Sequence, residues 1–290
     1  MSKPHTAILG LGIMGSGMAS RLLSLSFPVT VYNRSQAKAA PLVSAGARLA
    51  NSPREAASNA AIVISMVADD RASRDVWLGP DGALAGARAG SVLIESSTVS
   101  VGWVKELAAA AAEAGCKFLD APVTGTKPHA AAGELVFLVG GTAEALDAAR
   151  PVLSVLGRSV IHLGPQGSGA LMKLINNFVC GVQAASFAEA ARMIDEAGFD
   201  RQKAFSILTE GAPGSGIVKR MASRVLANDF EPNFVLRLMA KDLSYALQAA
   251  EARGSHLQTA GPALEIFQQA IAAGYGEEDF SAVTKGGKRR

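Results

Sequence analysis

The sequence predicts an α/β protein in which a doubly wound sheet domain is followed by an all-α domain, the two joined by a long helix. In the first half of the 290 residues, short β-branched runs alternate with alanine-rich helical stretches, which is the pattern of βαβ units on a parallel sheet. After His162 only long helical periodicity follows, interrupted by glycine and proline clusters. The length also favours two domains, and we place them at residues 1–163 and 164–290.

The expected sheet is built from short runs rich in valine, isoleucine, leucine and phenylalanine. Most of these runs have the length of a buried parallel strand. The stretches between them carry the apolar spacing of helices that cross over from one parallel strand to the next. In chain order the expected strands are Ala7–Leu9, Val29–Tyr32, Ile62–Met66, Val92–Glu95, Lys117–Asp120 and Leu135–Val139.

The second half is expected to begin with one long helix. The stretch from Ser168 to about Ala197 contains no proline, and a helix of that length is about 45 Å long at roughly 1.5 Å per residue. Two later helices are expected to start after Asp200 and Asn233, whose side chains can accept hydrogen bonds from otherwise free backbone N–H groups. The long helix is expected to lead out of the sheet domain and form the spine of the helical domain.

The composition excludes several classes of protein. The chain is 49% hydrophobic and 18% charged, which is too apolar for a disordered protein. The formal net charge of +3 is too small and too evenly spread for a nucleic-acid-binding surface, so we expect no nucleic-acid partner. Neither a membrane span nor a signal peptide is indicated, and we expect a soluble, cytoplasmic protein with no membrane partner.

The cysteines and histidines do not predict a metal site. Cys116 and Cys180 lack the CxxC spacing of zinc ligands, and the four histidines lie far apart in the sequence. We therefore expect no metal.

A glycine-rich loop follows the first expected strand. It consists of Gly10, Leu11, Gly12, Ile13, Met14 and Gly15, and a helical stretch and a second strand follow it within about 30 residues. In this setting the first glycine makes a tight turn, the second lets the backbone approach a pyrophosphate, and the third permits close packing of helix on strand. These residues are therefore the expected dinucleotide-binding loop of a Rossmann-type domain. The alternative is an ordinary glycine turn.

The end of the second expected strand carries the residues that should select the cofactor. An acidic residue here would accept hydrogen bonds from a ribose 2′-hydroxyl and repel a 2′-phosphate. The sequence instead places Asn33, Arg34 and Ser35 here, with Lys38 one turn later, so a guanidinium, a hydroxyl and an ammonium face the position of a 2′-phosphate. NADP(H) is therefore preferred over NAD(H). The alternative is that Arg34 is a solvated surface charge.

A lysine and an asparagine share one face of the long helix. Gly169, Lys173 and Asn177 are spaced four apart, so they line up, with a small residue where a flat ring can approach. The functional interpretation is that Lys173 is a general acid/base that donates to a carbonyl oxygen while hydride arrives from a nicotinamide. The alternative is a lysine that extends its charged end to solvent.

The loop after the fifth expected strand has the residues of an anion site. Asp120 ends that strand, at the carboxyl edge of the sheet where ligands bind in open α/β folds. The hydroxyls of Thr124 and Thr126, with backbone N–H groups around Gly125, are suited to hold a carboxylate. Taken alone, the segment is equally consistent with a plain turn.

With these motifs assembled, the chain resembles the β-hydroxyacid dehydrogenase family, which includes 3-hydroxyisobutyrate dehydrogenases and the glyoxylate/succinic semialdehyde reductases. The resemblance covers essentially the whole length, in the expected order and spacing. The motifs that carry it are Gly10–Gly15 with Met18 and Ala19, Glu95–Thr98, Asp120–Gly125, Gly140 with Gly141, Gly167–Asn177, Lys241 with Asp242, and Asp279–Ala282.

The resemblance implies a role for each matching residue. It makes Lys173 the catalytic acid/base and Asn177 a partner of the substrate and the lysine. It also implies a Rossmann domain joined by a long helix to an all-helical domain through which many members form homodimers or homotetramers. The segment Asn33–Ser35 is similar to that of members that use NADPH. Thr124, Gly125 and Thr126 are then expected to hold the acidic group of a small anionic substrate, and Val67, Thr98 and Lys241 to contact the cofactor.

The anion loop departs from the family pattern. The family usually has serine followed by two glycines, whereas this chain has Thr124-Gly125-Thr126 followed by Lys127, Pro128 and His129. This loop resembles the glyoxylate/succinic semialdehyde reductase branch more than the hydroxyisobutyrate branch. Two interpretations stay open: the bulky residues reshape the pocket for a larger anion such as a dicarboxylate semialdehyde or a phosphonate, or they are loop decoration.

The expected function is that of an NADP(H)-dependent oxidoreductase that reduces a small aldehyde or keto acid to its hydroxyacid, or the reverse. One alternative is a non-catalytic dinucleotide-sensing module that keeps the fold without the chemistry. Another is an imine reductase on the same scaffold, which is disfavoured because those relatives generally replace the catalytic lysine, whereas Lys173 is present here.

Overall fold

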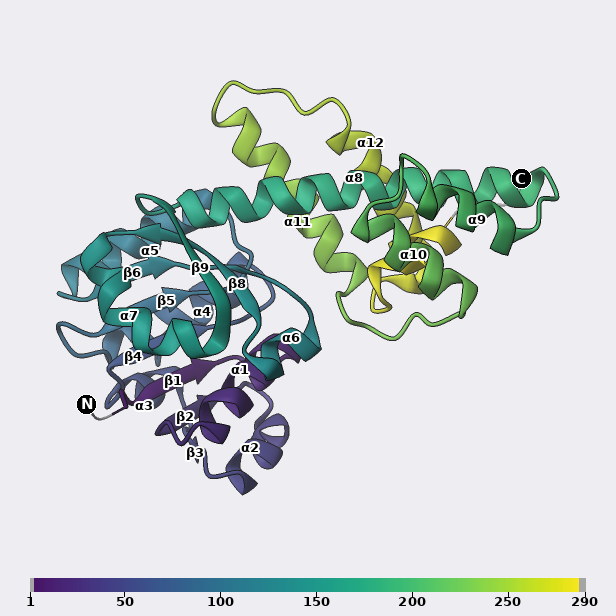
Figure 1. Ribbon diagram of the computed structural model, residues 1–290. Coiled ribbons are helices and arrows are strands. Elements are labelled where there is room, and N and C mark those ends of the chain that lie inside the picture. Colours follow the sequence, from purple (N-terminus) through teal and green to yellow (C-terminus); the bar gives the residue numbers. More distant parts are fainter. Residues whose placement is uncertain (1–2, 287–290) are drawn as a thin grey trace. The chain divides into compact units, whose positions relative to one another are not determined.

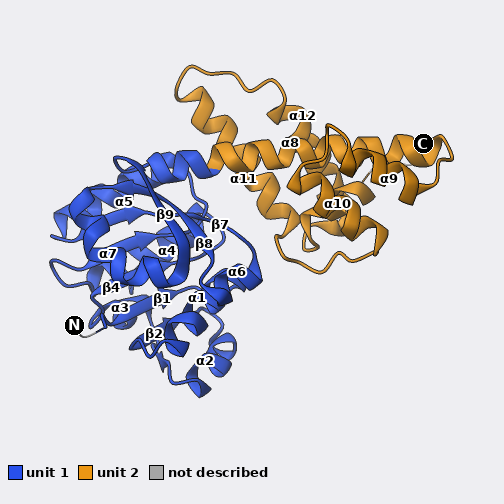
Figure 2. Ribbon diagram, viewed as in Figure 1, with its two compact units in different colours: residues 1–173 blue, residues 174–290 orange. Residues whose placement is uncertain are grey.

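The computed structural model describes residues 3–286, and the chain separates into two compact units, Met1–Lys173 and Leu174–Arg290 (Figure 2). The division falls within the long helix α8, Ser168–Glu196, whose first residues belong to unit 1. The boundary predicted between residues 163 and 164 lies just before this helix. Unit 1 contains the sheet and unit 2 is built from helices (Figure 1).

The sheet of unit 1 is doubly wound, as predicted. Its strand order is β3-β2-β1-β4-β5-β6-β8-β7, and β9 pairs with β8. The strands from β3 to β6 are parallel, and the chain changes direction across the sheet between β1 and β4, which is where such folds bind ligands. The strands are β1 Thr6–Leu9, β2 Val29–Tyr32, β3 Arg48–Leu49, β4 Ile62–Ser65, β5 Val92–Glu95, β6 Lys117–Asp120, β7 Val123–Thr124, β8 Leu135–Gly141 and β9 Gly157–Gly164.

All the predicted strands form, and β2, β5 and β6 have the predicted bounds. The sequence does not predict β3, β7 or β9. The first two of these have only two residues each. The third lies at the edge of the sheet, beside β8, and is exposed or half-buried along most of its length, so it lacks the apolar pattern of a buried strand.

Helices cover both faces of this sheet. Ile8 and Ile64 belong to a core that α1 and α7 share, and neighbouring strand residues point to the opposite face, where Trp77 of α4 and Trp103 of α5 are buried. The helical segments of unit 1 before α8 are α1 Ile13–Ser24, η1 Gln36–Ala39, α2 Ala40–Ser44, α3 Pro53–Ala57, α4 Asp70–Leu78, η2 Ala83–Ala85, α5 Val101–Glu113, α6 Lys127–Ala132 and α7 Ala143–Leu156.

In the described part of unit 2, residues 174–286, no strand is assigned, which confirms the predicted all-helical second half. Its core is formed by large apolar side chains such as Phe187, Phe205, Met221 and Phe267. The helical segments are the remainder of α8, α9 Arg201–Glu210, α10 Gly216–Leu226, α11 Leu236–Glu251, α12 Ala260–Ala270, η3 Ile271–Tyr275 and η4 Phe280–Lys285.

The observed helix ends support two predictions and correct a third. Helix α8 spans nearly the whole predicted stretch, and Asp200 caps α9 by accepting a hydrogen bond from the backbone N–H of Lys203 at 2.8 Å. The prediction that Asn233 caps the next helix is wrong. Helix α11 begins only at Leu236. The N–H of Leu236, to which an Asn233 cap would bond, donates instead to the carbonyl oxygen of Glu278 at 2.9 Å, and the segment before the helix is extended.

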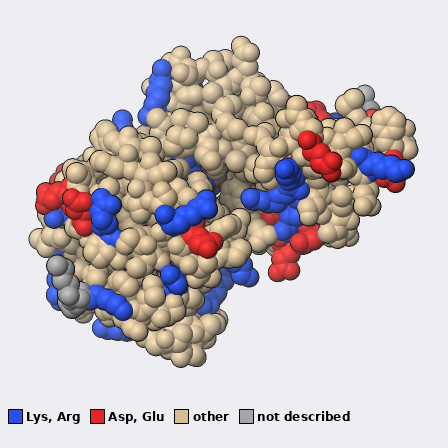
Figure 3. Space-filling model, viewed as in Figure 1, with Lys and Arg blue, Asp and Glu red and all other residues tan. Residues whose placement is uncertain are grey.

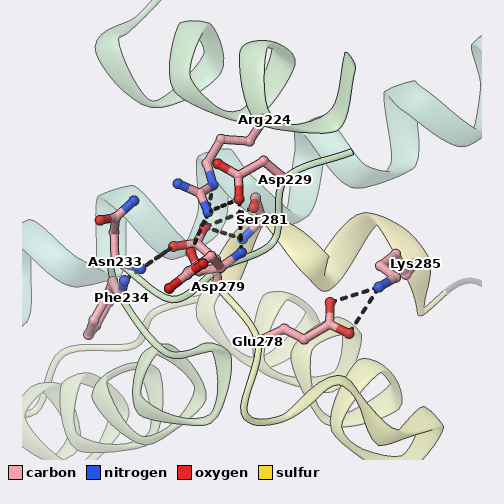
Figure 4. A network of polar contacts seen from close by, with 9 residues as sticks. Arg224, Asp229, Asn233, Phe234, Glu278, Asp279, Ser281 and Lys285 are labelled. Atoms are coloured by element: carbon pink, nitrogen blue, oxygen red, sulfur yellow. Dashed lines mark hydrogen bonds and ion pairs between the residues drawn. The ribbon is translucent and has the colours of Figure 1, made fainter. Parts of the chain in front are cut away.

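Asp279 is the centre of a polar network that ties the last helical turn to α10 and to the segment before α11 (Figure 4). Its carboxylate is buried and accepts hydrogen bonds from the backbone N–H of Phe234 and from the N–H and hydroxyl of Ser281. The guanidinium of Arg224 lies 3.4 Å from it. The resemblance placed Asp279 in a shared motif, and the structure gives this residue a structural role within unit 2.

Within residues 3–286, none of the helices is both long enough and apolar enough to cross a membrane. Over the same residues, no three or more His, Cys, Asp or Glu side chains are grouped as they would be around a metal ion. On the face drawn in Figure 3, basic and acidic side chains are scattered among uncharged surface.

Candidate functional site

The glycine loop joins β1 to α1 at the carboxyl edge of the sheet. Gly10 has φ +99°, and a Cβ on it would lie 2.3 Å from the carbonyl oxygen of Met66. A Cβ on Gly15 would lie 2.0 Å from the carbonyl oxygen of Gly10. No side chain could be accommodated at either position, because both contacts are with backbone. The first and third glycines therefore let the loop fold tightly on itself and against the residue that follows β4.

Gly12 has the opposite environment. It caps α1 without a side-chain hydrogen bond, and no atom beyond its immediate chain neighbours lies within 4 Å of where its Cβ would be. The backbone N–H groups of the first turn have no partner within the helix. The start of α1 therefore presents open N–H groups and the positive end of a helix dipole, which suit a phosphate group.

The end of β2 lies beside this loop, and Asn33 joins the two. Its side-chain oxygen accepts a hydrogen bond from the N–H of Leu11 at 2.9 Å, and its amide nitrogen donates to the carbonyl oxygen of Ser35 at 2.9 Å. Asn33 therefore holds the two loops in register. The side chains of Arg34, Ser35 and Lys38 are exposed, and neither Arg34 nor Lys38 forms an ion pair with another described residue.

Val67 and Thr98 lie in the loops after β4 and β5. A Cβ on Gly10 would lie 2.9 Å from Cγ1 of Val67, so this loop packs directly on the glycine loop. The N–H of Val67 donates to the hydroxyl of Ser97 at 2.8 Å, which brings the residue before Thr98 to the same edge. Unit 1 thus gathers the predicted cofactor residues from four different segments, with the exception of Lys241, which belongs to unit 2.

The predicted anion loop is held by a residue to which the sequence assigned no role. The N–H and the hydroxyl of Thr126 lie 3.1 and 2.7 Å from Nδ1 of His129, so His129 fixes Thr126 at the start of α6. Gly125 has φ +134°. Helix α6 packs on α1 so closely that a Cβ on Gly17 would lie 2.8 Å from that of Ala130. The anion loop therefore leads into a helix packed on α1, the helix that follows the glycine loop.

The first turn of α8 is capped by Asp120 from the end of β6. Its two carboxylate oxygens accept hydrogen bonds from the N–H groups of Gly167 and Ala170, each at 2.8 Å. Burial raises the pKa of the Asp120 carboxyl from 3.8 to about 6, although these N–H groups oppose the shift. A Cβ on Gly169 would lie 2.2 Å from the carbonyl oxygen of Leu138. The helix that carries Lys173 therefore starts at a tightly defined position on the sheet.

Lys173 and Asn177 lie one turn apart on α8, as predicted from their spacing. Lys173 is half-buried, whereas the Asn177 side chain is almost fully buried. The amide nitrogen of Asn177 donates to Asp242 on α11 at 2.5 Å. Its oxygen accepts a hydrogen bond from the amide of Asn176 at 2.9 Å. The orientation of Asn177 is thus set at both ends of its amide.

Asp242 brings two predicted site residues together within unit 2. It is completely buried, and its second oxygen lies 2.9 Å from Nζ of Lys241. The Lys241 ammonium also lies 4.9 Å from the ring centre of Tyr245. The sequence places Asp242 beside Lys241 but assigns it no role. No local pattern could connect it to Asn177, because the two residues are on different helices.

Comparisons with known proteins cover nearly the whole chain. Residues 5–164 match the family described as the NAD binding domain of 6-phosphogluconate dehydrogenase. Residues 167–286 match the family described as the NAD-binding domain of NADP-dependent 3-hydroxyisobutyrate dehydrogenase. The two matches adjoin at the glycine-rich segment before α8.

Individual relatives agree with these family matches. An NAD-dependent L-serine dehydrogenase of Pseudomonas aeruginosa is 36% identical over 286 residues, which is 96% of each chain. The chloroplastic glyoxylate/succinic semialdehyde reductase 2 of Arabidopsis thaliana is 34% identical, over 95% of this chain and 77% of the relative. Among solved structures, a 3-hydroxyisobutyrate dehydrogenase of Salmonella typhimurium aligns with a TM-score of 0.90 and 31% identity, over 98% of this chain and 99% of the other.

Proposed function

Because the chain belongs to the β-hydroxyacid dehydrogenase family of NAD(P)-dependent oxidoreductases, we propose that it interconverts a small aldehyde or keto acid and its hydroxyacid with NADP(H). The observation that carries this proposal is the pair formed by Lys173 and Asn177 on α8, with Asn177 held by the buried Asp242. An asparagine oriented at both ends beside a lysine is what a proton-transfer site needs.

The residues of unit 1 fit a dinucleotide. The open backbone at Gly12 suits the pyrophosphate. The exposed side chains of Arg34, Ser35 and Lys38 suit a 2′-phosphate, since a guanidinium and an ammonium make charge-assisted hydrogen bonds to phosphate. One relative is named as NAD-dependent, so membership of the family does not select the cofactor. The proposed preference for NADP(H) therefore rests on these residues at the end of β2. When bound, the reduced nicotinamide supplies the hydride.

Lys173 is the proposed acid/base of the reaction. In the direction of reduction, the carbonyl carbon of the substrate gains the hydride and its oxygen gains a proton from the Lys173 ammonium. The amine then recovers a proton from water, so the products are the hydroxyacid and the oxidised cofactor. In the other direction the neutral amine accepts the hydroxyl proton. Asn177 is proposed to orient the substrate beside the amine, because Asp242 prevents its amide from turning.

The loop Thr124–Thr126 is the proposed site for the acidic group of the substrate. Gly125 lies in a backbone conformation that favours glycine, and its N–H belongs to an exposed loop. Since the hydroxyl of Thr126 is engaged by His129, the Thr124 hydroxyl and the loop N–H groups are the proposed anion donors. The exposed Lys127 adds a positive charge next to them, which favours a small anionic substrate.

A substrate screen tests this proposal. The purified protein is mixed with NADPH and, separately, glyoxylate, succinic semialdehyde, tartronate semialdehyde, methylmalonate semialdehyde and short keto-phosphonates, and the absorbance of the reduced nicotinamide is followed. Consumption with one of these acids is expected. Binding of NADPH without consumption by any acid would favour the sensing module, and reduction of a cyclic imine alone would favour the imine reductase.

We also propose that two or more copies of the chain associate through the helical unit. Large apolar side chains are exposed there: Met193 is 68%, Phe199 66% and Ile207 72% exposed. Side chains of this kind lose unfavourable contact with water when a second copy covers them.

A further inference from the structure

A second buried carboxylate lies at the edge of the sheet where the cofactor is proposed to bind. Glu95 is the last residue of β5 and is completely buried. In the strand register it is paired with Ser65 of β4 on one side and Asp120 of β6 on the other. Glu95 is not part of the proton transfer described above, so its burial needs another explanation.

Both carboxylate oxygens of Glu95 are held by donors that carry no charge. Oε1 accepts a hydrogen bond from the N–H of Ser97 at 2.8 Å. Oε2 accepts from Nε1 of Trp77 at 2.9 Å and from the hydroxyl of Ser73. Nε1 of Trp103 in turn donates to that hydroxyl at 2.8 Å. Two tryptophans and a serine from α4 and α5 thus fix Oε2 of Glu95. The other oxygen, Oε1, is bonded to the loop after β5 through Ser97.

That loop is linked to the glycine loop by two short steps. The hydroxyl of Ser97 accepts a hydrogen bond from the N–H of Val67 at 2.8 Å. Val67 in turn packs against the glycine loop, since a Cβ on Gly10 would lie 2.9 Å from Cγ1 of Val67. Glu95 therefore sets the position of Ser97, and Ser97 sets the position of Val67 against the glycine loop.

These loops lie on one side of the pyrophosphate position. The strand order places β2 on one side of β1 and places β4 and β5 on the other. If the end of β2 holds the 2′-phosphate, the adenosine half of the cofactor occupies that side, and the other half extends over the loops after β4 and β5. Val67 and Ser97 belong to these latter loops.

We propose that Glu95 is a positioning residue for the nicotinamide half of the cofactor, acting through Ser97 and Val67. The inference rests on the proposed function, because it assumes that NADP(H) binds across the edge of unit 1. A carboxylate buried among uncharged donors is unfavourable compared with an apolar core, and a fully satisfied polar network makes the groups it joins rigid. In return, the network holds the loops after β4 and β5 in fixed positions beside the nicotinamide ring.

The test compares the Glu95→Gln variant with the unaltered full-length protein. An amide has one acceptor oxygen and one NH₂ group, so either Ser97 or Trp77 faces a donor in place of an acceptor. Dissociation constants are measured by calorimetry for NADP⁺ and for adenosine 2′,5′-bisphosphate, the 2′-phosphorylated adenosine part of the cofactor without the pyrophosphate, the second ribose and the nicotinamide. We expect binding of NADP⁺ to weaken about tenfold or more, the effect of one unsatisfied buried donor. Binding of the fragment should change by less than about twofold, because its contacts lie on the β2 side.

Two further variants keep the result interpretable. Ser97→Ala removes the acceptor of the Val67 N–H and leaves Glu95 in place, so it should weaken NADP⁺ binding selectively even where Glu95→Gln does not fold. Ser91→Ala is the matched control. Ser91 is also buried and immediately precedes β5, at its other end, where its hydroxyl donates to the carbonyl oxygen of Ala60. This variant should leave both dissociation constants unchanged.

The possible results distinguish a failure of the positioning role of Glu95 from a failure of the proposed NADP(H) binding. Selective loss of NADP⁺ binding in Glu95→Gln or Ser97→Ala supports the positioning role. Equal weakening of both ligands, or no change in either, overturns it. If the unaltered protein binds neither NADP⁺ nor the fragment, the proposed cofactor itself is wrong and the positioning role falls with it.

Discussion

The side-chain amide of Asn177 on α8 donates a hydrogen bond of 2.5 Å to the carboxylate of Asp242 on α11. Both side chains are buried, and the second Asp242 oxygen lies 2.9 Å from the Lys241 ammonium. A single carboxylate therefore fixes two residues that the family resemblance places in the active site. Replacing it with a neutral amide should release one of the two.

Replacing Asp242 with Asn is predicted to lower turnover without abolishing cofactor binding. The new amide has one acceptor oxygen for two donors, so either Asn177 or Lys241 loses its partner. We expect kcat to fall about tenfold to hundredfold, which corresponds to the loss of one hydrogen bond to a charged group. Steady-state kinetics with a substrate from the screen would measure this. An unchanged kcat would mean that Asn177 does not need to be held.

Replacing Lys173 with Ala is predicted to remove most of the catalysis and to leave the dissociation constant of NADPH nearly unchanged. Proton transfer by a positioned side chain contributes roughly 10²–10⁴-fold to rate. Turnover and NADPH affinity are measured on the same preparation. Met172→Ala is the matched control, because Met172 precedes Lys173 on α8 and is 37% exposed. Normal turnover in Lys173→Ala would rule out the acid/base assignment.

Replacing Arg34 with Asp is predicted to shift coenzyme preference toward NAD(H). The carboxylate repels a 2′-phosphate and accepts hydrogen bonds from a free 2′-hydroxyl. We expect the ratio of kcat/KM for NADPH over NADH to fall roughly tenfold or more, the value of a hydrogen bond between charged groups. Equal use of NADPH and NADH by the unaltered protein would remove the basis of this prediction.

The carboxyl of Asp120 should make the stability of unit 1 depend on pH. Burial raises its pKa from 3.8 to about 6, so the folded protein holds this proton more tightly than the unfolded chain does. Its stabilising effect is therefore complete below the unfolded pKa and is lost as pH rises through the folded pKa. Over that window the free energy of unfolding should fall by about 3 kcal/mol on account of this group.

Urea unfolding of the unaltered protein and of Asp120→Asn would isolate that effect. Several glutamates, including the half-buried Glu55 and the exposed Glu144, have pKa values lowered by hydrogen bonds and act in the opposite direction. They are common to both proteins and cancel in the difference. The difference in unfolding free energy between the two proteins should change between about pH 4 and pH 7. A difference that is constant with pH would show that Asp120 titrates normally.

Replacing Phe199 and Ile207 with Glu is predicted to weaken association between copies of the chain. The two side chains are 66% and 72% exposed, and a charge in a contact that excludes water is unfavourable. Sedimentation velocity would report the change in mass. Val43→Glu is the control, because Val43 is an exposed apolar residue of unit 1. A monomeric unaltered protein would contradict the proposed association.

Much of the fold was predictable because it follows from local patterns. The bounds of β2, β5 and β6 and nearly all of α8 match the apolar spacing of the sequence. The failures have a common cause. Asn233 looks like a helix cap, yet the helix starts later, because the N–H of Leu236 that it would cap donates to the carbonyl oxygen of Glu278, which is distant in the sequence. Strand β9 forms because β8 provides a partner along its length, which its own sequence does not indicate.

By itself, the sequence determined the order of the strands other than β3, β7 and β9, the glycine loop, the positive residues after β2 and the spacing of Lys173 and Asn177, since each of these depends on residues a few positions apart. Only the tertiary structure decided which buried carboxylate holds each segment of the proposed site in place. Asp120 caps α8, Asp242 orients Asn177, and Glu95 supports the loop of Ser97 from within a network that draws on α4 and α5. A hydrogen bond between distant segments leaves no periodicity in the chain, so it becomes visible only when folding has brought its donor and acceptor together.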